Sequence, residues 1–280
     1  MTQVDLEQGQ PSLNAMRSGT NPPLIARKRG IFPELAAEFF GVLILVVFGT
    51  GVNCAVTLSS NPGSVLGPPK GDWVSVSFGR AAGIGLGVWI SSRISAGHVN
   101  PAATLAMAII REFSWKKVPL YVFAQLLGGI CGAGIVYGNY IHAIDAFEGG
   151  RHIRTLATAG LFDPPAADYL TNISAFFEEF LGTAILLFAI CSARDKREGT
   201  DSQEPTGIHG DTAERAAIVA FITILGISIS IGAQTGFSLN PARDLGPRIL
   251  TAMVGYGRQV GVSAYDFFFY TGKDSIFNKE

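Results

Sequence analysis

Charged residues are scarce in this sequence of 280 residues: Asp, Glu, Lys and Arg make up only 15%, whereas a soluble domain carries about 25%. Hydrophobic residues make up 48%, and the mean hydropathy is +0.33. The charges crowd the first 30 residues, a few loops and the C-terminal end, with long apolar runs between them. A formal net charge of −1 gives no indication of a nucleic-acid partner. This distribution is typical of a protein that crosses a membrane several times.

Residues that bind metals or act in catalysis are also few. The three cysteines, Cys54, Cys131 and Cys191, lie far apart in apolar runs, which predicts packing residues rather than disulfides or metal ligands. The four histidines lack metal-ligand spacing, and no nucleophile is paired with a base, so we expect neither an enzyme nor a cofactor. Residues 1–30 have no apolar core of a signal peptide and are polar, which predicts a disordered cytoplasmic tail.

Several apolar segments have the length of a membrane-crossing helix, which needs about 20 residues. Basic residues gather before the first segment, between the second and third, and after the fourth. Because such clusters mark the cytoplasmic side, we expect a multi-pass protein of the cell membrane with its N-terminus in the cytoplasm. The five segments that qualify, or nearly so, are 32–58, 73–90, 118–140, 173–191 and 216–232.

The two halves of the chain repeat one another. The sequence Glu-Phe-Phe-Gly from Glu38 returns as Glu-Phe-Leu-Gly from Glu179, an offset of 141, and Asn-Pro-Ala from Asn100 returns from Asn240, an offset of 140. Three spans per half reverse the direction in which the second copy enters the membrane. The repeat is therefore predicted to be inverted, and its paired short apolar segments indicate a permeation site.

Each Asn-Pro-Ala box, Asn100-Pro101-Ala102 and Asn240-Pro241-Ala242, is expected to begin a short helix, because Asn favours the N-cap and Pro the first helical position. One such box could be only a turn, but two at matching places favour helices. Ten residues span about 15 Å, half of the apolar core. The helix ends, each carrying about +0.5 elementary charge, should meet at the midplane around a pore and repel cations. The Asn amides could donate hydrogen bonds to a passing oxygen.

With these motifs the chain resembles the major intrinsic protein family, the aquaporins and aquaglyceroporins. The matching motifs begin at Ala37 (AEFFG), Gly97 (GHVNPA) and Gly236 (GFSLNPARD), and the resemblance covers a channel domain at 31–258. It implies an all-α membrane protein, an inverted-repeat helical bundle with two re-entrant half-helices, and a homotetramer with one pore per subunit. The polar tail and the wording of the motifs resemble fungal members.

The resemblance also implies what passes. Asp244 follows the second Asn-Pro-Ala-Arg, as in the glycerol-passing branch, so the expected function is a passive channel for water and glycerol or similar polyols that excludes ions and protons. By the family pattern, Arg243 and Phe237 belong to the selectivity filter, together with Ser228. The remaining filter position, usually Trp, falls on Arg80, which would make the constriction strongly positive.

Two acids lie within predicted spans, Glu38 and Glu179. An unpaired charge is costly there, and in the family acids at these positions hold the re-entrant loops. We therefore expect each to pair with His98 or with loop backbone. A register shift of two residues would put Phe78 in the filter instead of Arg80, although no gap is obvious.

The repeat predicts a sixth span from about Arg258, but residues 259–280 are too polar to form one and are interpreted as a polar segment in its place. This favours an alternative function: a non-conducting or regulatory truncated paralogue that assembles with other aquaporins. A secondary transporter is a third possibility. It would need a coupling-ion site at the midplane, and Asp244 is the one acid beside either Asn-Pro-Ala box.

Overall fold

The computed structural model describes residues 30–194 and 212–256, and every regular element in these residues is an α-helix. Five helices are long and apolar enough to cross a membrane, which confirms the predicted fold class. The tail predicted at 1–30, except Gly30, and the segment 259–280 lie outside the described residues. The helices are α1 (Ile31–Ser59), α2 (Trp73–Ser95), α3 (Pro101–Ile110), α4 (Val118–Glu148), α5 (Leu156–Ala159), α6 (Asn172–Arg194), α7 (Thr212–Ser230) and α8 (Pro241–Met253).

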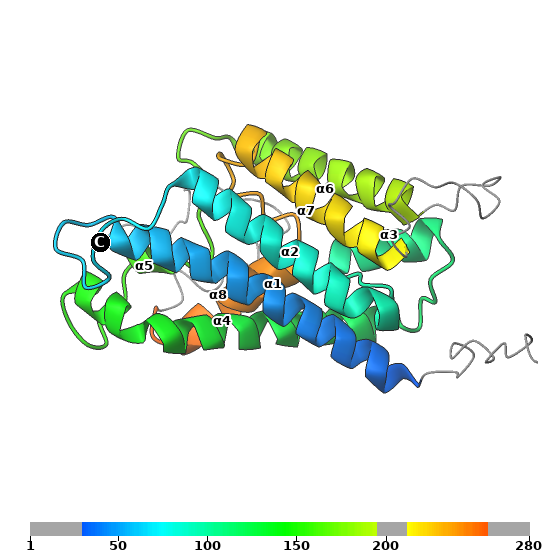
Figure 1. Ribbon diagram of the computed structural model, residues 1–280, viewed down its shortest axis with the longest axis horizontal. Helices are drawn as coiled ribbons and strands as arrows, with labels where there is room; N and C mark the ends of the chain where they lie inside the picture. The colour runs from blue at the N-terminus through cyan, green and yellow to red at the C-terminus, as the bar shows by residue number, and fades with distance from the viewer. Residues whose placement is uncertain (1–29, 195–211, 257–280) are drawn as a thin grey trace, which may run out of the picture. The chain divides into compact units, whose positions relative to one another are not determined.

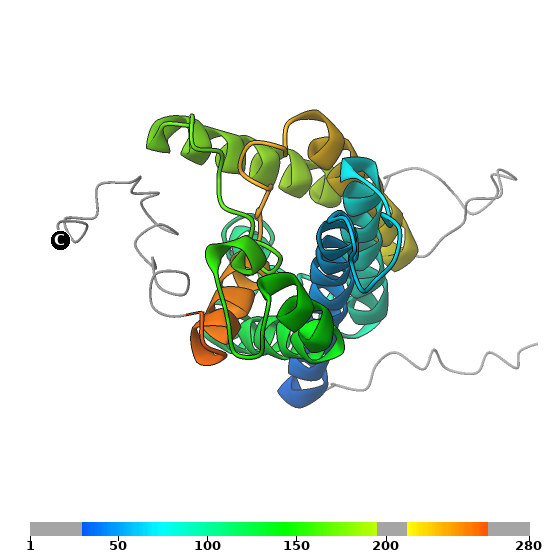
Figure 2. The same cartoon turned by 90° about the vertical axis from the view of Figure 1, so that its left-hand side faces the viewer.

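The long helices run along the long axis of the view in Figure 1, and they pack in a definite order. Helix α1 packs against α2 and α4, α2 against α7, and α7 against α6. The end-on view in Figure 2 shows α6 apart from α1 and α4, with α2 and α7 joining the two groups. The repeated pairs α1–α2 and α6–α7 therefore meet through their second members.

Glycines allow the helices to approach closely. A Cβ atom on Gly83 of α2 would lie 2.8 Å from the carbonyl oxygen of Leu45 in α1. A Cβ atom on Gly132 of α4 would lie 2.8 Å from the carbonyl oxygen of Leu43. Real Cβ atoms do not approach so closely, so these positions require glycine, as in other membrane helix interfaces.

The short helices α3 and α8 lie toward opposite ends of the long axis of the view in Figure 1. Helix α3 packs against α4, α6 and α8, and α8 also packs against α4. A groove of about 290 Å³ lies between α8 and α6 and is lined in part by Phe176, Glu179 and Phe180. In the first half, the corresponding face of α1 is covered by α4.

Candidate permeation site

The two Asn-Pro-Ala boxes cap the short helices as their sequence predicts. The side-chain oxygen of Asn100 accepts hydrogen bonds from the backbone N–H groups of Ala102 (2.8 Å) and Ala103 (3.4 Å). The side-chain oxygen of Asn240 accepts from Ala242 (3.0 Å) and Arg243 (3.3 Å). Both caps have extended backbone, and Pro follows at the start of each helix, where it lacks only an N–H that the helix does not use.

The capping amides also join the two halves. Nδ2 of Asn100 donates to the carbonyl oxygen of Leu239 (2.9 Å), and Nδ2 of Asn240 donates to that of Val99 (2.8 Å). This reciprocal pair places the N-termini of α3 and α8 against one another. Each amide nitrogen carries a second N–H, and both side chains line one cavity. A solute oxygen in that cavity can therefore accept from two amides at the positive ends of two helices.

The backbone before each box is held in an unusual conformation. Val99 and Leu239, whose carbonyl oxygens accept these bonds, have φ values of 43° and 49°, and Phe237 has φ of 42°. A positive φ is rare outside glycine and costs about 1–3 kcal/mol where surrounding structure imposes it. Val99 and Leu239 occupy matching positions of the repeat, and the carbonyl group of each points at the asparagine of the other half.

Glu38 holds the first of these loops. Its carboxylate accepts from the backbone N–H groups of His98 (2.9 Å) and Val99 (2.6 Å). It also accepts from Oγ of Ser95 (2.5 Å) and Nε2 of Gln125 (2.7 Å). Four donors converge on this fully buried carboxylate, which compensates the cost of placing its charge inside the bundle.

Glu179 occupies the matching place in the second half. It accepts from the backbone N–H groups of Ser238 (3.0 Å) and Leu239 (2.8 Å) and from Oγ1 of Thr235 (2.6 Å). Within the part of the chain that the structure describes, it therefore has three donors, and none corresponds to Gln125 of α4. Glu179 lines the groove beside α8 instead.

The side chain of His98 does not contact either glutamate. Its Nδ1 atom lies 3.3 Å from Oγ1 of Thr104, and its ring packs edge-on against Phe113. Sequence reasoning missed Gln125, which donates to both Glu38 and Thr104 (2.9 Å). The available signal was an amide within an apolar span, because a buried amide requires partners.

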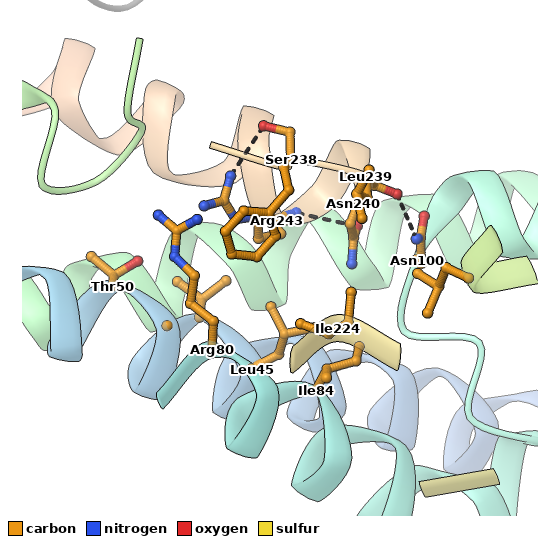
Figure 3. Close-up of a pocket in the computed structure, with 14 residues that line it drawn as sticks. Leu45, Thr50, Arg80, Ile84, Asn100, Ile224, Ser238, Leu239, Asn240 and Arg243 are labelled. Atoms are coloured by element: carbon orange, nitrogen blue, oxygen red, sulfur yellow. Dashed lines mark hydrogen bonds between the residues drawn. The ribbon is translucent and has the colours of Figure 1, made fainter. Parts of the chain in front are cut away.

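The cavity has a volume of about 40 Å³, enough for about three water molecules at roughly 10–15 Å³ each. Figure 3 shows the guanidinium groups of Arg80 and Arg243 toward one end and the amides of Asn100 and Asn240 toward the other. Apolar side chains form much of the remaining wall. The lining residues are Leu45, Val46, Gly49, Thr50, Arg80, Ile84, Asn100, Leu186, Ile224, Phe237, Ser238, Leu239, Asn240 and Arg243.

Arg80 extends from α2 to this cavity, in the place given by the ungapped register. Its side chain is 6% exposed, and Nη1 donates to the carbonyl oxygen of Gly236 (2.7 Å). The guanidinium carbon lies 4.6 Å from the centre of the Phe237 ring, a cation–π contact. Phe78, the alternative from a shifted register, is 50% exposed and is not among the lining residues.

The structure places Ser228 outside the lining of this cavity. Its Oγ atom lies 2.6 Å from Oγ of Ser77, and its carbonyl oxygen accepts from Nε1 of Trp73 (3.1 Å). The Trp73 ring packs edge-on against Phe237, with 6.0 Å between ring centres. Ser228 therefore connects α7 to α2 and supports Phe237 through Trp73.

Arg243 belongs to a cluster of alternating charges. Its Nη1 atom donates to Oγ of Ser238 (3.0 Å) and lies 4.0 Å from Oδ1 of Asp163. Asp163 forms an ion pair with Arg248, which also pairs with Asp244 (3.2 Å). Asp244 does not line the cavity. It accepts a hydrogen bond from Oγ of Ser238 (2.9 Å) and so positions the Ser238 side chain, which contacts Arg243.

Asp163 was not identified from the sequence, because nothing in its loop indicates proximity to Arg243. Burial and the nearby charge of Asp244 raise the pKa of Asp163 well above its usual range, although Arg248 and Arg243 act in the opposite direction.

Comparison with known proteins agrees with this geometry. A model of the family described as "Major intrinsic protein" matches residues 26–269. Aquaporin-6 of Laccaria bicolor is 52% identical over 282 residues, covering 93% of this chain and 87% of the relative. The aquaglycerol porin AQY3 of Saccharomyces cerevisiae is 40% identical, covering 92% of this chain and 41% of the relative. Both organisms are fungi, in agreement with the resemblance to fungal members.

A solved structure supports the same assignment. The aquaglyceroporin from Plasmodium falciparum is 28% identical and superposes with a TM-score of 0.71, covering 86% of this chain and 88% of that one. Five apolar helices, two capped half-helices and these relatives lead to one conclusion. The chain belongs to the major intrinsic protein family, as a multi-pass membrane channel of the aquaporin type and not an enzyme.

Proposed function

We propose that this chain forms a passive pore for water and small neutral solutes such as glycerol, and that the pore excludes cations and protons. The observation that carries the proposal is the meeting of two half-helix N-termini, at which the amides of Asn100 and Asn240 line the cavity that also holds Arg243. Positive helix ends and a guanidinium repel cations. A water that accepts from both amides has its lone pairs engaged, which interrupts proton transfer along a water chain.

One residue of this chain and the names of two related proteins support the passage of glycerol. Asp244 follows the second box, as in the glycerol-passing branch that the sequence resembles. The yeast relative is named an aquaglycerol porin, and the Plasmodium protein an aquaglyceroporin. Phe237 and the apolar wall would contact the carbon backbone of a polyol while Arg243 donates to its hydroxyl groups.

We place the pore in the cell membrane with the N-terminus in the cytoplasm. Basic residues at one end of the helices support this orientation. Arg194, at the end of α6, donates to the carbonyl oxygens of Ala96 (2.5 Å) and Gly97 (3.0 Å), just after α2. Lys117, before α4, donates to Glu34 in the first turn of α1 (2.7 Å). Tyr121 of α4 bonds both to Glu34 and to the carbonyl oxygen of Ser95 at the end of α2, so these cationic helix ends lie at the same end of the bundle.

A homotetramer is part of the proposal. Its support is the family resemblance and an open apolar depression of about 530 Å³ over α1, α2 and α4, lined in part by Phe48, Val52 and Ile135. Mass measurement of the detergent-solubilised protein tests this directly. Four copies per particle are expected, and a monomer at all concentrations would contradict it.

The test of conduction is stopped-flow light scattering on vesicles that contain the purified protein. A sorbitol gradient reports water efflux, and an inward glycerol gradient reports reswelling. We expect both to exceed those of protein-free vesicles by about tenfold or more, because a formed pore replaces slow passage through lipid. Rates equal to those of protein-free vesicles, with the protein present in the membrane, would contradict the proposal.

A non-conducting subunit is the second candidate. The observation that favours it is Arg80, which brings a second guanidinium to a cavity of only about 40 Å³. Co-expression separates the two functions. A non-conducting subunit would assemble with a conducting aquaporin and lower the flux per particle, whereas a conducting subunit would not.

A further inference from the structure

Arg80 carries a buried positive charge that its surroundings compensate only in part. Among the described residues it forms no ion pair, and its one hydrogen bond is the bond from Nη1 to Gly236. Its Nε atom is buried without a hydrogen-bond partner in the described part of the chain. Asp163 and Glu179 attract it at longer range, but each is already engaged with other donors. A buried arginine with unused donors indicates a ligand that accepts from it.

A second positive group faces the same small space. Arg243 and Arg80 line the same cavity (Figure 3), and their positive charges repel each other. The acids nearby do not line the cavity: Asp163 and Asp244 both pair with Arg248, and Asp163 also lies 4.0 Å from Arg243. The N-termini of α3 and α8 add further partial positive charge. Two guanidinium groups and no carboxylate of the described residues therefore line the cavity, which makes its surface positive.

The size of the cavity limits what can bind. Its volume of about 40 Å³ suits a ligand of three or four non-hydrogen atoms, since one water needs roughly 10–15 Å³. A guanidinium group presents a flat fork of donors that matches a planar oxyanion. Formate and nitrate have this size and shape, whereas gluconate does not fit.

We propose that the cavity between Arg80 and Arg243 binds a small planar monovalent anion, such as formate or nitrate, and that the bound anion obstructs the pore. Leu45, Ile84 and Ile224 form the adjoining wall, and none of them can replace the hydration of an anion. The anion is therefore held at the guanidinium end. Binding of the anion is inferred from Arg80 and Arg243 alone. Obstruction of the pore by the anion rests in addition on the proposed function as a channel.

Direct binding is tested independently of conduction. Saturation-transfer NMR detects the single proton of formate in contact with the purified protein in nanodiscs. Transfer to formate is expected, together with displacement by nitrate and loss in Arg80→Gln. Arg93→Gln is the matched control, because Arg93 is an exposed arginine of the same helix that pairs with Glu214 (2.8 Å). No transfer in the wild type, or equal transfer in Arg80→Gln, would overturn the proposed site.

A second variant covers the case in which Arg80→Gln does not fold. Arg80→Lys keeps the charge but loses the planar fork, so formate transfer should fall below that of the wild type without vanishing. Undiminished transfer in a folded Arg80→Lys would contradict recognition by the guanidinium fork.

Obstruction is tested by water flux in nitrate and in gluconate at equal ionic strength. Nitrate should slow wild-type water efflux by about twofold or more, and this ratio should return to one in Arg80→Gln but persist in Arg93→Gln. Conduction that is equal in both salts would refute obstruction. Absence of conduction in gluconate would instead contradict the proposed function, while the NMR result would still decide whether the anion binds.

Discussion

At the scale of single residues, both halves of the chain hold a carboxylate surrounded by hydrogen-bond donors. From the residues that the structure describes, Glu38 accepts four hydrogen bonds and Glu179 accepts three. All of these donors except Gln125 belong to residues that carry a positive φ or lie next to one. The charge is tolerated inside the bundle because the donors replace the water that it loses.

Replacing Glu38 with Gln should therefore destabilise the protein. The amide NH₂ would face groups that also donate, and each buried donor left without an acceptor costs about 1–3 kcal/mol. Glu179→Gln should cost less, because Glu179 has one donor fewer among the described residues and lines an open groove. Thermal unfolding in detergent measures both, with the exposed Glu112→Gln as a control. Equal midpoints for Glu38→Gln and Glu112→Gln would contradict this account.

Asp163 makes stability depend on pH. Its pKa in the folded protein is raised by burial and by Asp244, above roughly 3.9 in the unfolded chain. The folded state therefore holds this proton more tightly, and stability falls as the pH rises from the unfolded pKa through the folded one. Asp163→Asn, which resembles the protonated form, should flatten this part of the curve of unfolding midpoint against pH. An unchanged slope would show that Asp163 does not titrate there.

At the scale of elements, the half-helices and spans were predictable from the sequence. Asn followed by Pro specifies a helix start on local grounds, and apolar length specifies a span. The contacts across the fold were not predictable. Gln125 meets Glu38 across 87 residues, and Asp163 approaches Arg243 from a loop. Which donor meets which acid depends on helix packing, and no local pattern encodes it.

Close helix contact predicts the effect of enlarging glycines. Gly132→Leu should destabilise the α1–α4 pair by about 1–3 kcal/mol or prevent assembly, because its Cβ atom would lie 2.8 Å from the carbonyl oxygen of Leu43. Gly138→Leu is the matched control on the same helix, because a Cβ atom there meets nothing within 4 Å. Size-exclusion profiles and unfolding midpoints compare the two. Similar behaviour of both variants would contradict close packing at Gly132.

At the scale of the whole molecule, the inverted repeat brings the two Asn-Pro-Ala boxes together in one cavity. In the first half of the chain, α4 packs against α1. In the second half, α6 instead borders a groove within the described residues. The pore-facing contacts are nevertheless paired across the repeat, since each asparagine bonds to the carbonyl before the other. The central claim is that solutes pass through this cavity.

One pair of variants tests that claim most directly. Gly49 lines the cavity, and a Cβ atom there would lie 3.5 Å from Cγ of Arg80, whereas Gly138 lines no part of it and a Cβ atom there meets nothing within 4 Å. Water efflux is measured by stopped-flow light scattering in vesicles with equal amounts of each variant. Gly49→Leu should lose nearly all protein-dependent flux, and Gly138→Leu should keep it. Undiminished flux through Gly49→Leu would contradict a pathway through this cavity.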